Sequence, residues 1–231
     1  VYHCTHNKMA DDINQKKIKE LGGRAHSYTA DVKGDFKETQ YPNDEILELK
    51  IGAQIMFIRN DTSPDKKYFN GKLAQISYLD EDEISVILDG SEEEITLKAE
   101  TWEQKKYSLD DEKNIKEEVL GSFKQFPIRL AWAVTIHKSQ GLTFDRLIID
   151  AGKSFASGQV YVALSRCRTL EGIILKSKIT PEVIFSDKRV SKFQDETHAN
   201  SKIDEILNSE KYDYSKKKVI RRIDCVWFVS A

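Results

Sequence analysis

Two cysteine patterns are missing from this sequence: a closely spaced pair, and a cluster of cysteine with histidine. Cys4, Cys167 and Cys225 stand alone among the 231 residues, so we expect reduced, buried thiols rather than disulfides or metal ligands. No apolar run reaches the ~18 residues that a membrane helix needs, and the first residues do not have the layout of a signal peptide. These absences favour a cytoplasmic protein without a membrane partner.

An excess of positive charge is missing as well. The sequence has 36 Lys and Arg residues against 38 Asp and Glu residues, which gives a formal net charge of −2. No global basic field therefore indicates a nucleic-acid partner, and any such partner has to be bound by a local group of residues. With 39% hydrophobic residues, the chain can form one core, or a core and a small satellite domain.

Short apolar segments alternate with helical patterns near the start of the chain and again after Pro127. Residues 1–4 are apolar and β-prone, and residues 7–21 place apolar side chains on one helical face. Alternating strands and helices favour an α/β fold with a mostly parallel sheet and helices on both faces. In the later part, strands are predicted over 129–133, 147–149 and 172–175, the last of them buried, and helices over 134–140 and 158–167.

The segment between these two parts has the pattern of antiparallel β structure. Residues 53–58 form an apolar run typical of a buried strand. From 72 to 125, short alternating strands are separated by acidic turns such as Asp89-Gly90, which are hairpin signals. We therefore predict a small antiparallel β-barrel inserted into the larger domain. The predicted domains are an α/β domain over 1–70 and 126–180, the barrel over 71–125, and a carboxy-terminal extension over 181–231.

The carboxy-terminal extension has weaker signals, and its role is open. A polar helix is predicted near 202–210, and an apolar strand over 225–229. Between them lies a basic cluster that consists of 216–218 with Arg221 and Arg222.

The stretch Ala131–Thr143 places hydroxyls, an imidazole, an ammonium and an amide at the end of an apolar strand. An open α/β sheet binds its ligands at that edge. Hydroxyl and backbone N–H groups donate hydrogen bonds to phosphate oxygens, lysine adds charge, and glycine lets the backbone approach closely. The stretch therefore predicts a phosphate-binding edge, although a polar turn that caps a short helix would have the same composition.

A second stretch, Gly158–Arg168, has the pattern of an apolar helix that ends in a pair of arginines. The guanidinium groups of Arg166 and Arg168 either reach a ligand or offset the partial negative charge at the carboxyl end of the helix. The residues alone leave both interpretations open.

The two stretches together resemble a known family. Thr135–Gly141 resembles motif V, and Tyr161–Arg166 resembles motif VI, of the petite-integration-frequency DNA helicases of superfamily 1, which are related to the alpha subunit of bacterial exonuclease V. Thr5-His6-Asn7 with Asp12 and Asn14 resembles motif IV. The segments 52–57 and 68–71 resemble the start of the family's accessory barrel, and the resemblance covers roughly residues 1–178.

This resemblance implies the second RecA-like motor domain of an ATP-dependent DNA helicase. Such a domain binds ATP with Mg²⁺ jointly with an amino-terminal P-loop motor domain. Arg166 matches the arginine finger, the catalytic residue that stabilises charge on the γ-phosphate. Gln140 and Gly141 are expected to face the nucleotide from the same side.

The resemblance also implies contacts with single-stranded DNA. A packed core histidine is the alternative for His137, a tight turn is the alternative for the pair at the start of the barrel, and Trp132 is expected in the core rather than against a base. The expected nucleic-acid-binding residues are Thr5, Asn7, Asn70, Gly71, Thr135, His137, Lys138 and Ser139.

The sequence lacks a complete P-loop. Ala151-Gly152-Lys153-Ser154 copies its end, but Leu147 stands where GxxxxGK[ST] needs glycine. We therefore expect a part of a longer, nucleoid-associated protein of bacterial type, with no ATPase activity of its own. The expected partners are single-stranded DNA and the P-loop domain, with a monomer favoured. The alternative is a non-catalytic nucleic-acid-binding or interaction module derived from a helicase.

Overall fold

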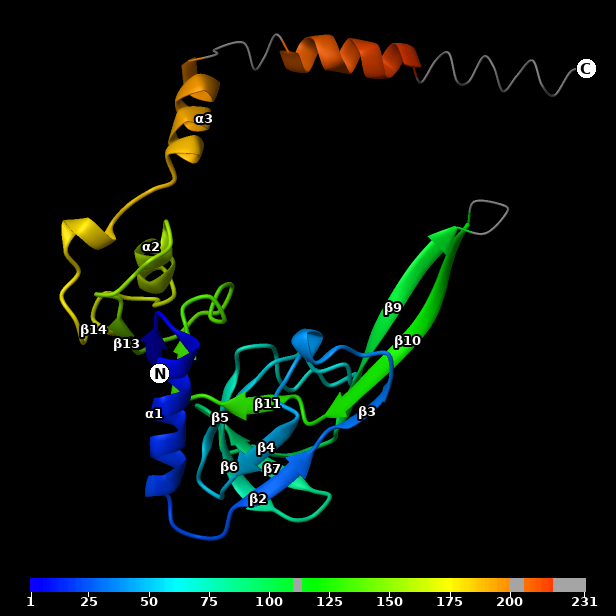
Figure 1. Cartoon of the computed structure of the whole chain (residues 1–231), viewed down its shortest axis with the longest axis vertical. Coiled ribbons are helices and arrows are strands. Elements are labelled where there is room, and N and C mark those ends of the chain that lie inside the picture. The colour runs from blue at the N-terminus through cyan, green and yellow to red at the C-terminus, as the bar shows by residue number, and fades with distance from the viewer. Residues whose placement is uncertain (110–113, 200–205, 218–231) are drawn as a thin grey trace, which may run out of the picture. The chain divides into compact units, whose positions relative to one another are not determined.

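A computed structural model of the chain describes residues 1–109, 114–199 and 206–217 (Figure 1). The chain divides into two compact units, Val1–Ile184 and Phe185–Ala231. The basic residues Arg221 and Arg222, the strand predicted over 225–229 and the first part of the helix predicted near 202–210 lie outside the described residues. No helix in the described part is both long and apolar enough to span a membrane.

The first unit contains a four-stranded parallel sheet in the order β12-β1-β13-β14. Its strands are β1 (Tyr2–Cys4), β12 (Ala133–Thr135), β13 (Leu147–Asp150) and β14 (Ile173–Leu175). The predicted α/β fold with a parallel sheet is thereby confirmed. Because all four strands run in the same direction, the loops that follow them emerge at one edge of the sheet.

Helices pack on both faces of this sheet. Helix α1 (Asn7–Glu20) packs its Ala10 against Cys4 and Ala133 on one face. The short helix α2 (Gln159–Leu164) contributes Val160 and Ala163 to a larger apolar cluster on the other face, which includes the inward side chains of β12 and β13. Alternation along each strand explains the division, since neighbouring side chains point to opposite faces.

The other strands of the first unit pair only in the antiparallel sense. Their core contains large side chains that are almost fully buried, among them Phe57, Ile76 and Ile84. One sheet has the order β11-β5-β6-β7-β8, a second has β3-β10-β9, and β2 pairs with β4. The bounds are β2 (His26–Thr29), β3 (Asp31–Gly34), β4 (Ile46–Leu49), β5 (Gln54–Phe57), β6 (Leu73–Leu79), β7 (Ile84–Leu88), β8 (Glu94–Leu97), β9 (Glu100–Leu109), β10 (Ile115–Gln125) and β11 (Ile128–Leu130).

This antiparallel pairing includes strands upstream of residue 71, where the predicted barrel begins. Strand β5 pairs with β6 on one side and with β11 on the other. The domain boundaries stay a prediction. Each of the strands β2, β3, β4 and β5, however, pairs within an antiparallel sheet and not within the parallel one. Two 3₁₀ turns, η1 (Glu38–Gln40) and η2 (Pro181–Val183), complete the regular structure of this unit.

Three sequence predictions after Pro127 were wrong in detail. The strand predicted over 129–133 is two strands, because β11 pairs antiparallel with β5 whereas β12 pairs parallel with β1. The helix predicted over 134–140 is instead the end of β12 followed by turns. The strand predicted as buried over 172–175 lies at the sheet edge, with Ile174 61% exposed. The helix predicted over 158–167 exists but is shorter, Gln159–Leu164.

The second unit contains helix α3 (Lys188–Ala199) and a further helical segment over 206–217. The described end of this segment includes Lys216 and Lys217 of the predicted basic cluster. Its helical residues from 206 onward agree with the later part of the helix predicted near 202–210.

Candidate nucleic-acid and nucleotide interface

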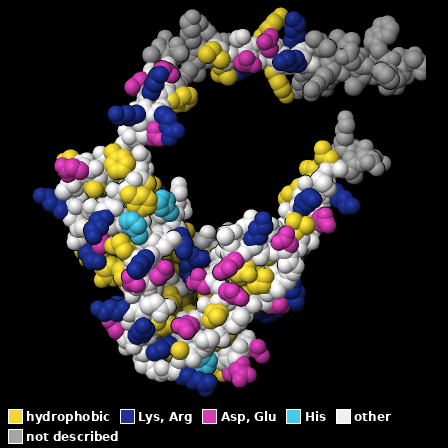
Figure 2. All heavy atoms as spheres, viewed as in Figure 1, with side chains coloured by type: hydrophobic (Ala, Val, Ile, Leu, Met, Phe, Trp, Pro, Cys, Tyr) yellow, Lys and Arg dark blue, Asp and Glu magenta, His cyan; other side chains and the backbone are white. Residues whose placement is uncertain are grey.

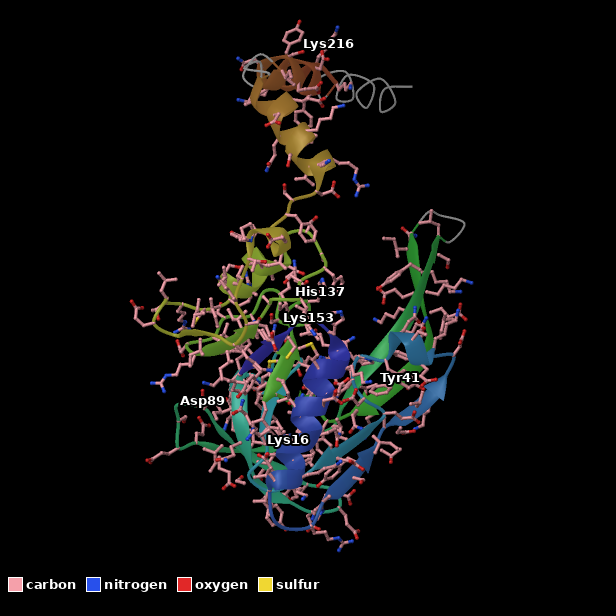
Figure 3. The ribbon with its side chains drawn as sticks, turned by 60° about the vertical axis from the view of Figure 1, so that its left-hand side comes forward. Lys16, Tyr41, Asp89, His137, Lys153 and Lys216 are labelled. Atoms are coloured by element: carbon pink, nitrogen blue, oxygen red, sulfur yellow. The ribbon has the colours of Figure 1, made fainter. Side chains whose placement is uncertain are left out.

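Three loops meet at the carboxyl edge of the parallel sheet. They follow three neighbouring strands: Thr5-His6 follows β1, 136–141 follows β12, and 151–158 follows β13. Most of the site residues predicted from the sequence lie in or beside these loops. Figure 3 shows His137 and Lys153 near the amino-terminal end of α1, which begins directly after the first loop. The carboxyl edge is where open α/β sheets bind ligands.

The loop after β12 is a tight turn held by its own side chains. Thr135 is buried, and its Oγ1 accepts a hydrogen bond from the backbone N–H of Lys138 at 3.3 Å. Ser139 is fully buried, and its Oγ donates to the carbonyl of Ile136 at 2.8 Å. The predicted contact of the Ser139 hydroxyl with DNA therefore does not fit this geometry, because that hydroxyl stabilises the turn from inside.

The same turn exposes its other predicted residues. The side chains of His137, Lys138 and Gln140 are exposed, so His137 is not a packed core histidine in this fold. Gly141 has φ +86, a left-handed conformation that favours glycine. The turn thus presents an imidazole, an ammonium and an amide to solvent on one short segment.

A pocket of about 430 Å³ lies between α1 and the strands β4, β11 and β12. Its lining brings together three predicted DNA contacts, Asn7, Thr135 and Lys138, with Arg129. Partial burial, and after it the positive charge of Arg129, lowers the pKa of the Lys138 ammonium from its ordinary value. The Lys138 ammonium and the Arg129 guanidinium repel each other, and a bound phosphate would relieve this repulsion.

Arg129 was not predicted as a site residue. Its Nη2 donates to the carbonyl of Pro42 at 3.0 Å, while its buried Nε has no hydrogen-bond partner within the described part of the chain. Burial lowers the pKa of its guanidinium, although Asp44 and Asp11 act in the opposite direction. Because these two carboxylates also line the pocket, they offset part of its positive charge.

Arg166 follows the end of α2 and is half-buried, with a guanidinium that contacts the loop after β12. Its Nη1 donates to the carbonyl of Leu142 at 3.3 Å, and its Nε donates to the carbonyl of Val162 at 3.2 Å. Phe144, three residues after the motif V segment, also pairs with the end of the motif VI segment, since Phe144 N donates to Arg166 O at 2.9 Å and Arg168 N donates to Phe144 O at 3.1 Å. The chain directly after the motif V segment is therefore hydrogen-bonded to the motif VI segment.

Asn70 and Gly71 form a turn before β6. The backbone N–H of Asn70 donates to Asn60 Oδ1 at 2.8 Å, and that of Gly71 donates to the carbonyl of Phe57 at 2.8 Å. Gly71 has φ +93, and a Cβ at this position would collide with the side chain of Leu142. The glycine therefore lets the antiparallel strands pack against the loop after β12, whereas Asn70 lies outside the pocket that Asn7 and Lys138 share.

Trp132, expected in the core, and Lys153, part of the incomplete P-loop segment, lie in different surroundings. Trp132 is partly buried and packs against the core of the antiparallel strands. Lys153 lies exposed in the loop after β13, and no complete P-loop surrounds it. The loop after β13 also contains Phe155, which is 57% exposed and was not predicted as a site residue.

His3 is a buried histidine beneath this edge. It is 0% exposed, and among the described residues neither ring nitrogen has a hydrogen-bond partner. Phe144 packs edge-on against it, with 5.2 Å between the ring centroids. Burial above all, followed by nearby positive charge, lowers the pKa of His3 to about 3. The imidazole is therefore neutral in the folded state at neutral pH.

We expect His3 to make folding stability depend on pH. The folded pKa lies below the unfolded value of about 6.5, so the unfolded chain binds the proton first and stability falls as pH decreases from that value toward 3. The expected loss is about 2 kcal/mol between pH 7 and pH 5. Urea unfolding of the native chain and of His3→Leu at pH 5, 6 and 7 measures this. An identical pH dependence in the two proteins would contradict it.

A parallel α/β sheet with helices on both faces, and with polar loops at its carboxyl edge, is the architecture of a RecA-like helicase domain. The homologues of this chain are Pif1-family ATP-dependent DNA helicases, and the chain matches a Pif1-type carboxy-terminal half. No profile of a known protein family matches the chain. The family resemblance seen in the sequence is thus confirmed by comparison with individual relatives.

Rat ATP-dependent DNA helicase PIF1 is 34% identical over 202 residues, which cover 82% of this chain and 29% of the relative. A Bacteroides Pif1 in complex with ADP-AlF4 is 39% identical to this chain, with a TM-score of 0.77. The match covers 87% of this chain and 45% of the Bacteroides chain. A Bacteroides Pif1 bound to single-stranded DNA is 39% identical to this chain, with a TM-score of 0.68. The match covers 87% of this chain and 46% of that Bacteroides chain. The chain spans less than half the length of these relatives.

Proposed function

We propose that this chain supplies the second motor domain of an ATP-dependent DNA helicase. In this proposal Arg166 is the arginine finger for ATP bound jointly with a P-loop motor domain of the same protein, and the carboxyl edge of the parallel sheet forms part of a single-stranded DNA track. The observation that carries the proposal is the hydrogen bond that Arg166 Nη1, in the motif VI segment, donates to the carbonyl of Leu142, the residue directly after the motif V segment.

The environment of Arg166 supports its role toward a nucleotide. Its guanidinium donates to two carbonyls and to Ser165 Oγ at 3.0 Å, and no carboxylate of the described residues forms an ion pair with it. Neutral acceptors orient the group but leave its charge uncompensated. A forked cation of this kind suits the charge that develops on a γ-phosphate.

Gln140 and Gly141 precede Leu142, so the turn that accepts a hydrogen bond from Arg166 also presents them to solvent. We assign them to the same nucleotide, with Gly141 letting the backbone approach. The ADP-AlF4 complex of a Bacteroides relative supports a nucleotide in this family. No group of His, Cys, Asp and Glu among the described residues could hold a metal ion. We assign Mg²⁺ to the nucleotide and the P-loop domain, as the family resemblance implies.

The proposed DNA track uses the pocket of Asn7, Thr135 and Lys138 and the exposed His137 beside it. Thr5 is buried, with its Oγ1 against His6 Nδ1 at 2.8 Å, so we assign it to the support of the track. The relative bound to single-stranded DNA supports this class of ligand. We further propose that the antiparallel strands form a small barrel beside the track, and that the protein is a monomeric, nucleoid-associated enzyme of the cytoplasm.

Replacing Lys138 with glutamine is expected to weaken the binding of single-stranded DNA and its dependence on salt. Loss of one phosphate contact lowers the slope of log K against log salt by about 0.7 for a single strand. Fluorescence anisotropy with a labelled oligonucleotide at several salt concentrations measures the slope. Lys33→Gln, which removes an exposed charge on β3, is the control that should keep the native slope.

The same measurement separates the proposal from its alternative, a non-catalytic nucleic-acid-binding or interaction module. An unchanged slope in Lys138→Gln, with the slope lowered instead by Lys216→Gln or Lys217→Gln in the second unit, would favour the alternative. The alternative has its own supporting observation, since these two lysines lie on a helical segment outside the motor fold.

A further inference from the structure

One exposed aromatic ring lies where the three loops of the carboxyl edge meet. Phe155, in the loop after β13, is 57% exposed. The ring of His6, from the loop after β1, lies 4.8 Å from it at an interplanar angle of 37°. The ring of His137, from the loop after β12, lies 6.3 Å away at 51°. Three neighbouring parallel strands thus each supply one ring to a single cluster.

Side-chain hydrogen bonds hold the backbone of the loop that contains Phe155. Gln159 is buried, and its Oε1 accepts a hydrogen bond from the backbone N–H of Phe155 at 3.0 Å. Its Nε2 donates to the carbonyl of Thr5 at 3.5 Å, so one side chain joins the loops after β13 and β1. Ser154 Oγ donates to the carbonyl of Ala151 at 2.8 Å and closes the same loop from the other side. The exposed ring is therefore held in place rather than left on a free loop.

The surroundings of the ring favour a small planar ligand over a protein surface. The neighbours on either side are imidazoles, and Lys153 is exposed in the same loop. A stable protein interface needs an apolar core within roughly 1,200 Å² of buried surface or more, which a single ring cannot supply. Figure 2 shows two histidine side chains near each other beside hydrophobic ones on the visible face of the molecule.

We propose that Phe155, flanked by His6 and His137, is a stacking platform for one nucleobase of single-stranded DNA. The inference rests on the proposed function and adds a base-contacting group to a track whose other contacts are to phosphate. Every nucleobase has a π-face, so the platform accepts any base. His137 links the two kinds of contact, since Lys138, the next residue, lines the phosphate pocket.

The test uses the 231-residue chain and oligonucleotides that contain 2-aminopurine at successive single positions. Stacking quenches this base, so the native chain should quench it most strongly at one position. Phe155→Leu keeps an apolar side chain without a ring and should bind single strands roughly 5- to 100-fold more weakly. Its salt slope should equal the native slope, because stacking releases no counterions. Phe155→Trp should restore both affinity and quenching.

An abasic site at the quenched position gives a second, independent measure. It should weaken binding by the native chain as much as Phe155→Leu does, and it should have little further effect on that variant. Tyr78→Ala, which removes an exposed ring on β6, should bind as the native chain does. Native affinity and quenching in Phe155→Leu would overturn the platform while leaving the phosphate track intact. Absence of single-strand binding by the native chain would overturn the track and the platform together.

Discussion

Replacing Arg166 with alanine is expected to lower DNA-stimulated ATP hydrolysis by about 10³- to 10⁵-fold in a protein that joins this chain to an amino-terminal P-loop domain. Among the described residues the guanidinium has only neutral acceptors, so its charge is available to a γ-phosphate. Alanine removes that charge without leaving a large buried cavity, since the side chain is partly exposed. Steady-state phosphate release with saturating single-stranded DNA measures the effect.

Two further variants separate a role in turnover from a role in folding. Arg166→Lys keeps a charge but loses the planar fork, so it should recover only a small part of the activity. Arg168→Ala removes a neighbouring exposed arginine, which forms an ion pair with Asp145 at 3.3 Å, and should keep nearly native turnover. DNA binding should be close to native in all three proteins. Turnover within tenfold of native in Arg166→Ala would remove the arginine-finger assignment.

Local pattern was sufficient for the elements whose partners lie close in the sequence or whose apolar faces are clear. The strand at 2–4, the helix at 7–20 and the strand at 147–150 were predicted because each buries one regular set of apolar side chains. The segment 128–135 was not divided correctly, since both halves are apolar and only their distant partners, β5 and β1, decide where each strand belongs. The helix predicted over 134–140 failed for a related reason, because Val134 and Thr135 are β-branched and continue the strand.

The same distinction applies to the candidate site: residues in short motifs can be recognised from the sequence, whereas residues that depend on contacts far away in the chain cannot. Thr135, His137, Lys138 and Arg166 could be named as candidates from the sequence because they stand in short, consecutive motifs. Arg129 and Phe155 could not, since the role of each depends on contacts with residues far away in the chain. Gln159 is the clearest case, because its amide joins Thr5 across 154 positions of sequence. Ser139 shows the converse error, since a polar residue in a motif can serve the turn itself.

Replacing Asn14 with leucine is expected to destabilise the first unit by about 2 to 6 kcal/mol. Asn14 is buried on α1, and its Nδ2 donates to the carbonyl of Ala133 at 2.8 Å while its Oδ1 accepts from the N–H of Ala133 at 2.9 Å. Strand β12 is an edge strand whose other side pairs with β1. The amide thus takes the place of a neighbouring strand, and leucine would leave both backbone groups of Ala133 buried without a partner.

Urea unfolding measures this loss, and hydrogen exchange at the Ala133 amide locates it. Asn14→Asp keeps an acceptor for the N–H but loses the donor, so its stability should lie between those of the native chain and Asn14→Leu. Lys16→Leu changes an exposed position on the same helix and should unfold close to the native urea concentration. Native stability in Asn14→Leu would show that β12 is held by its pairing with β1 alone. Because Thr135 ends the same strand and Lys138 follows it, a real loss at Asn14 should also weaken single-strand binding, which the anisotropy measurement detects at urea concentrations below the unfolding transition.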